Sequence, residues 1–184
     1  KSTECDGRSG LVLLTRIAIS AQPSAFSEEM PRLQTPIALL DIMPDKILSP
    51  RFFSRPTVQV ARSLLGKYLV RAIDGRTLAG KIIEVEAYVG PDDKACHASK
   101  GRTKRTEVMF GPGGVAYVYL IYGMYHCLNV VTEQEEFPSA VLIRAIEIDG
   151  DLIDGPGRLC RVLQIDRGLN RVDLTTGELL WFED

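Results

Sequence analysis

Two β-rich runs joined by an Asp-Gly turn constrain the fold of this chain more than any other feature. The runs cover 67–73 and 77–87, and Asp74-Gly75-Arg76 lies between them. Because Asp-Gly readily adopts the positive φ angles of a two-residue hairpin turn, the runs are expected to pair antiparallel. On the second run, the two-residue period of a strand places on one face Ile82, Glu84, Glu86 and Tyr88.

Further strand-like runs cover 115–122, 124–132 and 140–148, and the first two meet at a tight turn at Gly123. A helix is expected before the first hairpin, capped by Ser54, with Pro56 in its first turn and Gly66 at its end. The segment 89–114 is rich in Gly, Pro and charge, which indicates a functional loop with one short helical turn. Together these features predict an α+β fold: a single domain with a curved antiparallel sheet flanked by short helices.

The first part of the chain lacks a clean period. Residues 1–48 carry four prolines and read as a leader or loose N-terminal extension, so the folded domain is expected over 49–184. The longest apolar stretch, 11–21, is interrupted by Arg16 and is shorter than a membrane span. We expect a monomer with no membrane partner, located in the cytoplasm at the nucleoid in a bacterium or in the nucleus of a eukaryote.

Charge is unevenly distributed although the net charge is only -2. Residues 51–110 contain twelve Lys or Arg against six acids, whereas 133–184 contain twelve acids against five Arg. The basic part is compatible with a face that contacts phosphate, and a solvated mixed surface is the alternative interpretation. Within it, a loop without acids offers three candidate phosphate-binding residues, Arg102, Lys104 and Arg105.

Cysteine and histidine spacing argues against a metal site. The four cysteines form no CxxC pair, and each of the two histidines neighbours a cysteine, at Cys96-His97 and His126-Cys127. Adjacent residues of an extended backbone point to opposite faces, so neither pair readily supplies two ligands. We expect no metal and no cofactor, with a metal-dependent hydrolase as a remote alternative.

Glu86 and Arg144 are the candidate catalytic residues. Glu86 lies among apolar neighbours, and Arg144 lies inside the apolar run 140–146, where an arginine needs an anionic partner. If the two strands are close, Glu86 can act as the base for a water molecule that Arg144 helps to orient. A structural ion pair is the alternative interpretation.

The densest aromatic segment, 117–125, includes Tyr119, Tyr122, Met124 and Tyr125. A turn at Gly123 places Tyr122 and Met124 at a hairpin tip, where large apolar side chains are a liability unless they meet a partner. Wedges of this kind push between base steps and hold an extruded nucleotide out of a duplex. Ordinary strand packing is the competing explanation.

An ordered set of segments carries a family resemblance: 83–91, 102–110, 117–124, 142–145 and 154–160, together with His97 and Asn129. The set strongly resembles the alkyladenine (3-methyladenine) DNA glycosylase family. The resemblance implies a monofunctional glycosylase that flips damaged purines out of double-stranded DNA and hydrolyses the N-glycosidic bond. The damaged purines are alkylated, with deaminated and etheno bases as further candidates.

The same resemblance implies roles for individual residues. Glu86 matches the general base and Arg144 the arginine that helps to bind the water. Tyr88, His97 and Tyr119 match residues that enclose the flipped base, and Asn129 matches the residue that screens its minor-groove edge. Tyr122 matches the side chain inserted where the nucleotide leaves.

The chain departs from the family in three places. Residues 1–48 match no family segment, a segment near 148–153 is shortened, and the usual C-terminal strands after Trp181 are missing. The last of these usually supply part of the wall of the site. A second functional hypothesis is a catalytically idle module that binds damaged DNA through the same aromatic hairpin, although pure binding requires neither Glu86 nor Arg144.

Overall fold

Eight strands and short helical segments make up the part of the chain that the computed structural model describes, residues 15–18 and 46–184. The strands are β1 (Thr15–Ala18), β2 (Tyr68–Ile73), β3 (Arg76–Tyr88), β4 (Ala116–Ile121), β5 (Tyr125–Val131), β6 (Ala140–Ile148), β7 (Asp151–Asp154) and β8 (Leu180–Glu183). The α-helices are α1 (Pro50–Phe53), α2 (Thr57–Leu64) and α3 (Pro156–Val162). Three 3-10 turns are η2 (His97–Lys100), η3 (Glu107–Phe110) and η4 (Arg167–Leu169).

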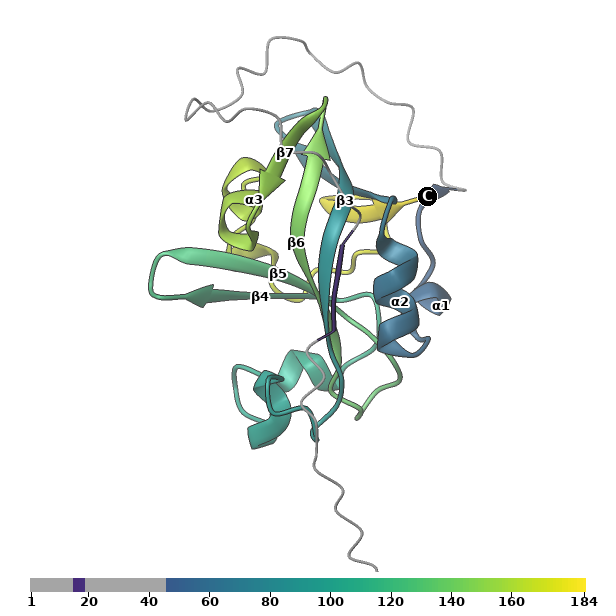
Figure 1. Cartoon of the computed structure of the whole chain (residues 1–184), viewed down its shortest axis with the longest axis vertical. Coiled ribbons are helices and arrows are strands. Elements are labelled where there is room, and N and C mark those ends of the chain that lie inside the picture. The colour runs from purple at the N-terminus through teal and green to yellow at the C-terminus, as the bar shows by residue number, and fades with distance from the viewer. Residues whose placement is uncertain (1–14, 19–45) are drawn as a thin grey trace, which may run out of the picture.

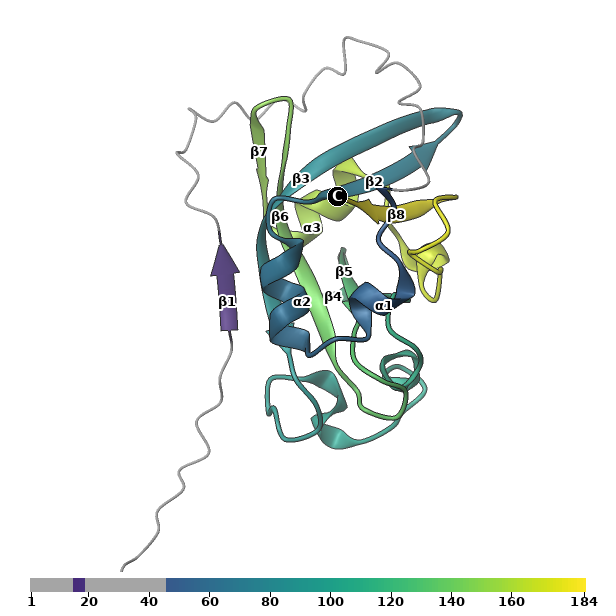
Figure 2. The ribbon, with the colours of Figure 1, turned by 90° about the vertical axis from the view of Figure 1, so that its right-hand side faces the viewer.

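All described strands belong to one antiparallel sheet. Its order is β4-β5-β6-β3-β2-β8, with β1 beside β3 and β7 beside β6. The sheet is strongly curved, and short helices flank it (Figures 1 and 2). The predicted α+β class, with a single domain built on a curved antiparallel sheet, is therefore confirmed.

Two predicted hairpin turns are present and use the same backbone geometry. Asp74 and Gly75 have φ angles of 48° and 74° between β2 and β3, and Tyr122 and Gly123 have φ angles of 52° and 72° between β4 and β5. Two consecutive positive φ angles are the requirement of a two-residue turn that matches the twist of antiparallel strands. Asp-Gly adopts this geometry easily, whereas a tyrosine in the left-handed region is strained.

A third turn of this kind lies within 148–153, the segment expected from the sequence to be shortened. Asp149 and Gly150, with φ angles of 53° and 87°, connect β6 directly to β7. The register pairs Ile148 with Asp151 and Ala145 with Asp154. The short connection is therefore closed by a tight hairpin, and β7 is a strand that was not predicted from the sequence.

The main hydrophobic core lies between the sheet and the helix that precedes it. Val60, Ala61 and Leu64 of α2 are fully buried in one cluster with Val85 and Ala87 of β3. The sequence predicted that Ile82 shares a face with Glu84, but Ile82 is buried in this core cluster. The pairing of β3 with β6 is irregular between Ile82 and Val85, so the strict alternation of faces is broken there. The core thus fixes the strand that carries the candidate catalytic glutamate.

The predicted cap of α2 is wrong. Pro56 is the residue that precedes Thr57, the first residue of the helix, and no side chain caps it. Ser54 instead ends α1, and its hydroxyl donates to the carbonyl of Pro50. The proline at 56 already fixes an extended entry to α2, so the chain does not need the serine there.

Part of the predicted N-terminal extension contacts the sheet. β1 pairs antiparallel with β3, with Arg16 opposite Glu86. Leu48 is buried, and its amide donates to the carbonyl of Phe182 in β8. The segment 89–114, for which one helical turn was predicted, contains both η2 and η3.

Candidate active site

An ion-pair cluster joins β3 to β6. Arg144 donates from Nε to Oε1 of Glu84 at 2.9 Å, and its Nη1 lies 3.1 Å from Oε1 of Glu86. The side chains of Glu84 and Glu86 expose only 9% and 13% of their surface, so both carboxylates depend on these partners. The structure brings Glu86 and Arg144 together as predicted, but it shares Arg144 between two carboxylates.

Glu84 also binds a second guanidinium, that of Arg16 on β1. Arg16 donates from Nη2 to Oε2 of Glu84 at 3.0 Å, and its Nε bonds to Oε1. Burial raises the pKa of Glu84, but the hydrogen bonds and charges of Arg16 and Arg144 outweigh it and hold that pKa below its ordinary value. Glu84 is therefore an ionised anchor between two arginines.

Tyr88 connects the ion-pair cluster to an aromatic pocket. Its hydroxyl donates to Oε2 of Glu86 at 2.7 Å, and its side chain lines the pocket. Burial, followed by the hydrogen bond and charge of Glu86, raises the pKa of Tyr88 well above its ordinary value. The phenol therefore keeps its proton near neutral pH. Glu86 does not itself line the pocket but is linked to it through this hydrogen bond, and each of its carboxylate oxygens has one neighbour.

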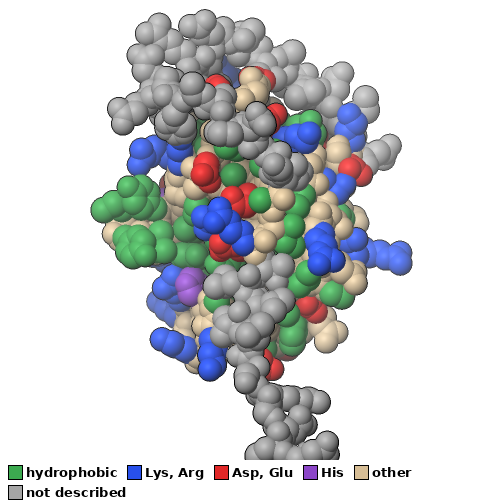
Figure 3. Space-filling view, viewed as in Figure 1, with side chains coloured by type: hydrophobic (Ala, Val, Ile, Leu, Met, Phe, Trp, Pro, Cys, Tyr) green, Lys and Arg blue, Asp and Glu red, His purple; other side chains and the backbone are tan. Residues whose placement is uncertain are grey.

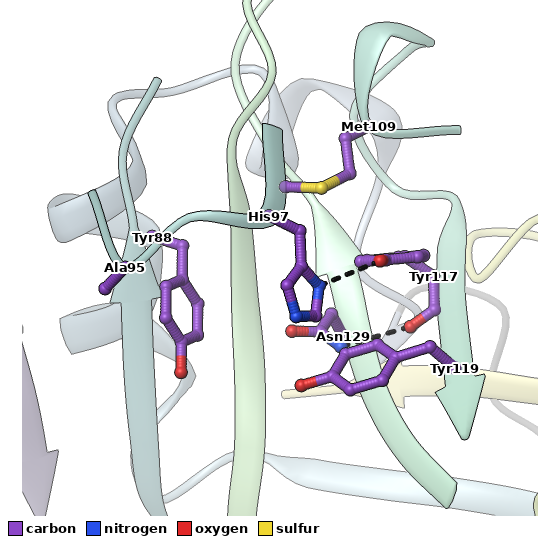
Figure 4. A pocket seen from close by; sticks show the side chains of 7 residues that line it. All are labelled: Tyr88, Ala95, His97, Met109, Tyr117, Tyr119 and Asn129. Atoms are coloured by element: carbon purple, nitrogen blue, oxygen red, sulfur yellow. Dashed lines mark hydrogen bonds between the residues drawn. The ribbon is translucent and has the colours of Figure 1, made fainter. Parts of the chain in front are cut away.

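The pocket is built mainly from aromatic rings. Figure 4 shows Tyr88 on one side of it and His97 and Tyr119 on the other. The rings of His97 and Tyr119 meet edge to face, with centroids 4.6 Å apart. Such surroundings suit a flat ring, and electron-rich tyrosine faces favour a cationic one. The full lining is Tyr88, Ala95, His97, Met109, Tyr117, Tyr119 and Asn129.

A second hydrophobic cluster packs against the residues that line the pocket. It joins the 89–114 segment to β4, β5 and β6 through seven buried residues: Cys96, Ala98, Val108, Met109, Tyr117, Val131 and Ala140. Tyr88 and Tyr119 pack against this cluster. The pocket walls are therefore held by packing as well as by hydrogen bonds.

His97 is held between two neighbours. Its Nδ1 lies 2.9 Å from the hydroxyl of Tyr117, and its Nε2 lies 3.5 Å from Nη2 of Arg105. A guanidinium can only donate, so Nε2 accepts and Nδ1 carries the proton of the neutral ring. Burial, and then the charge of Arg105, lower the pKa of His97. The pocket thus contains a neutral imidazole near neutral pH.

Asn129 is buried in β5 at 2% exposure and lines the same pocket. Its Nδ2 donates to the backbone carbonyl of Tyr117 at 3.2 Å, across the β4–β5 pair. This bond fixes the orientation of the amide. All four predicted pocket residues, Tyr88, His97, Tyr119 and Asn129, therefore line one pocket.

The β4–β5 hairpin carries an exposed apolar tip. Tyr122 is 84% exposed and Met124 is 65% exposed, while Tyr125 and Leu120 are also among the exposed large hydrophobic residues. Figure 3 shows hydrophobic side chains protruding at the left, where Figure 1 places this hairpin, with Lys, Arg and His side chains below them. An apolar protrusion beside cations suits a partner whose exterior carries negative charge and whose interior consists of stacked planar rings.

A basic groove of about 610 Å³ runs beside β4. Lys104 and Arg105, both predicted phosphate contacts, line it together with Arg167 and Arg171. The guanidinium of Arg105 also lies 4.9 Å from the centre of the Tyr119 ring. The groove therefore adjoins the outer side of the aromatic pocket.

Arg102, the third predicted phosphate contact, does not line this groove. It pairs with Glu136, and its guanidinium lies 4.4 Å from the centre of the Phe110 ring.

Arg167 and Arg171 were not predicted from the sequence, because they are dispersed in an acidic part of the chain. Glu84 was placed on the face of Glu86 but given no role, although the two-residue spacing was the available signal.

Within 15–18 and 46–184, no three His, Cys, Asp or Glu side chains come together in a way that could hold a metal ion. Cys96, Cys127 and Cys160 are buried and free. No helix in the described part of the chain is long and apolar enough to cross a membrane.

A held carboxylate, an aromatic pocket, an apolar wedge and a basic groove lie on neighbouring elements. This combination is typical of enzymes that act on the bases of nucleic acids. Residues 51–184 match the model of the family described as "Methylpurine-DNA glycosylase (MPG)".

Individual relatives agree with this match. A protein of Methanocella arvoryzae is 51% identical over 154 residues, covering 75% of this chain and 77% of the relative. A protein of Legionella pneumophila (strain Paris) is 57% identical over 136 residues, covering 72% and 74%, and one of Myxococcus xanthus is 54% identical over 134 residues, covering 70% and 69%. Each is named "Putative 3-methyladenine DNA glycosylase".

The chain belongs to the methylpurine-DNA glycosylase family. It is therefore a DNA glycosylase, an enzyme of DNA repair that removes alkylated bases.

Proposed function

We propose that this glycosylase flips a damaged purine out of duplex DNA and hydrolyses its N-glycosidic bond with a water molecule activated by Glu86. The observation that carries the proposal is the position of Glu86, whose carboxylate bonds to Arg144 and to Tyr88, a residue that also lines the aromatic pocket. A base enclosed by that pocket would present its sugar to Glu86. Glu86 is held ready to accept a proton from water.

For a cationic alkylated purine the chemistry needs no further group, whereas a neutral purine such as ethenoadenine must also take up a proton from solvent as it leaves. Glu86 takes a proton from water, the water oxygen bonds to C1′ of the sugar, and the electron pair of the broken C–N bond leaves with the base. Alkylation makes the purine cationic, so it departs as a neutral molecule. The tyrosines of the pocket favour such a cation, and Asn129 is positioned to contact the edge of the base.

Duplex DNA would be engaged by the elements beside the pocket. Tyr122, supported by Met124, fills the gap left by the extruded nucleotide, since both side chains are exposed at a hairpin tip. Lys104 and Arg105 contact phosphates together with Arg167 and Arg171, which line the same groove, and Arg102 contacts a phosphate outside that groove. One domain holds all of these residues, which supports action as a monomer. The candidate lesions are 3-methyladenine, which appears in the names of the relatives, together with deaminated and etheno purines.

The decisive variant is Glu86→Gln, which keeps the shape of the side chain and removes its basicity. A duplex with a single ethenoadenine reports flipping by fluorescence and excision by strand cleavage at the abasic product. We expect flipping to persist and excision to be lost. Excision by Glu86→Gln at the wild-type single-turnover rate would contradict the proposal, and flipping without excision by the wild type would indicate an idle damage-binding module.

A further inference from the structure

Glu84 is a buried, ionised residue without a place in the mechanism above. Its side chain is 9% exposed, and it does not line the aromatic pocket. Both of its oxygens are nevertheless occupied by arginine donors. Burying a carboxylate costs free energy unless positively charged hydrogen-bond donors compensate it, so the partners of Glu84 indicate what it does.

The partner that depends on Glu84 is Arg144. A guanidinium is a rigid planar fork, so fixing one of its nitrogens restricts the positions of the others. Glu84 holds Nε at 2.9 Å, and only Nη1 is then directed at Oε1 of Glu86, at 3.1 Å. Without Glu84, the same fork could turn to bind both oxygens of Glu86 in a bidentate pair, the preferred geometry of arginine with a carboxylate.

Glu84 is in turn held by Arg16. β1 pairs with β3 along 84–87, which brings the guanidinium of Arg16 over Glu84. Two arginines and two glutamates then balance in charge, so neither carboxylate lacks a countercharge. Arg16 lies outside the residues that match the family, 51–184, so the family match does not account for it.

We infer that Arg16 and Glu84 are positioning residues for excision: Arg16 secures Glu84, and Glu84 orients Arg144 so that it bonds only to Oε1 of Glu86. Oε2, which accepts one hydrogen bond from Tyr88, then keeps a lone pair for water. The inference rests on the proposed role of Glu86 as the base. In this arrangement β1 contributes a positioning residue to the active site, although the sequence predicted that this segment belongs to a leader or loose extension.

The test compares Glu84→Gln, Arg16→Ala and Arg16→Lys on the ethenoadenine duplex. We expect Glu84→Gln to slow single-turnover excision about tenfold or more, because the neutral amide still accepts from Arg144 but loses the charge that strengthens this hydrogen bond. Arg16→Ala should have a smaller effect, because the Arg16 side chain is 60% exposed. Arg16→Lys should recover part of the rate, and the flipping fluorescence should remain at the wild-type level throughout. Lys81→Ala, an exposed position on the same strand, is the matched control.

A double-mutant cycle separates this arrangement from independent effects. If Arg16 acts through Glu84, adding Arg16→Ala to Glu84→Gln causes no further loss of rate. Additive losses, an unchanged rate in Glu84→Gln, or a parallel loss of flipping would each overturn the inference. The two proposals fail in different ways: normal excision by Glu86→Gln removes the mechanism itself, whereas an inactive Glu86→Gln beside a fully active Glu84→Gln removes only the positioning role.

Discussion

The hydroxyl of Tyr88 donates to the carboxylate of Glu86 at 2.7 Å, from two residues farther along the same strand. One side chain therefore contributes a ring to the pocket and a proton donor to the proposed catalytic base. Its two functions can be separated by experiment.

Tyr88→Phe keeps the ring and removes the donor. We expect single-turnover excision of ethenoadenine to fall about tenfold, since hydrogen bonds to charged groups contribute roughly 1.5–3 kcal/mol. Flipping should be unchanged because the stacking surface remains. The raised pKa of Tyr88 keeps the phenol protonated near neutral pH, so the deficit should be the same from about pH 6 to about pH 8. A wild-type rate in Tyr88→Phe would mean that the bond to Glu86 is not used in the reaction.

Tyr122 offers a variant in which stability and function change in opposite directions. It occupies the left-handed region with φ of 52°, and it is 84% exposed. Asparagine tolerates this backbone geometry, so Tyr122→Asn should stabilise the fold by ~1 kcal/mol, seen as a higher Tm. The same change removes the proposed wedge, so the flipping equilibrium should weaken by about one to two powers of ten, from a stacking contribution of ~1–3 kcal/mol.

Tyr122→Ala is the companion variant. It loses the wedge without the preference of asparagine for the turn, so it should lower flipping equally and give less stabilisation. Full flipping of ethenoadenine by either variant would show that Tyr122 is only a surface residue.

The basic groove should determine general affinity for DNA. Replacing Lys104 and Arg167 with glutamine should weaken binding of damaged and undamaged duplexes alike. The slope of log affinity against log salt should decrease in size by about 0.9 for each phosphate that the protein no longer neutralises. Arg62→Gln serves as the control, because it is exposed on α2, which packs against the main core. An unchanged salt slope in the double variant would place this groove away from DNA.

His97 should titrate below its ordinary pKa, and Arg105 should be part of the cause. Removing the positive charge in Arg105→Gln should raise the pKa of His97. Because a depressed pKa means that the folded state resists protonation, the contribution of His97 to stability is present above about pH 6.5 and declines as pH falls toward its folded pKa. The chain has two histidines, so NMR titration of the ring protons resolves them. An identical His97 titration in wild type and Arg105→Gln would contradict this account.

Turn chemistry and strand alternation were sufficient to predict much of the sheet. The Asp74-Gly75 hairpin and the turn at Gly123 were predicted because their residues suit positive φ angles. The pairing of Glu86 with Arg144 was predicted because an arginine inside an apolar run requires an anion. These signals are local, or follow from a single buried charge.

What the sequence did not reveal depends on contacts between distant segments. Arg16 contacts Glu84 across 68 positions of sequence, and nothing near Arg16 indicates that partner. Arg167 and Arg171 reach the groove only because the chain folds back beside β4. β7 spans only Asp151–Asp154 and begins and ends with acids, so its two central apolar residues gave too short a pattern to be recognised as a strand.

The tight Asp149-Gly150 turn has a consequence for how a protease would cut this enzyme. Proteases need an exposed segment that can unfold locally into their binding cleft, and a two-residue hairpin turn with paired strands on both sides does not provide one. The segment 89–114, with exposed residues such as Lys100 and Lys104, is the more accessible substrate for trypsin. A single cut there would fall between Glu86 and Tyr119 in the chain while leaving the strands paired, so the nicked protein could remain folded with an altered pocket.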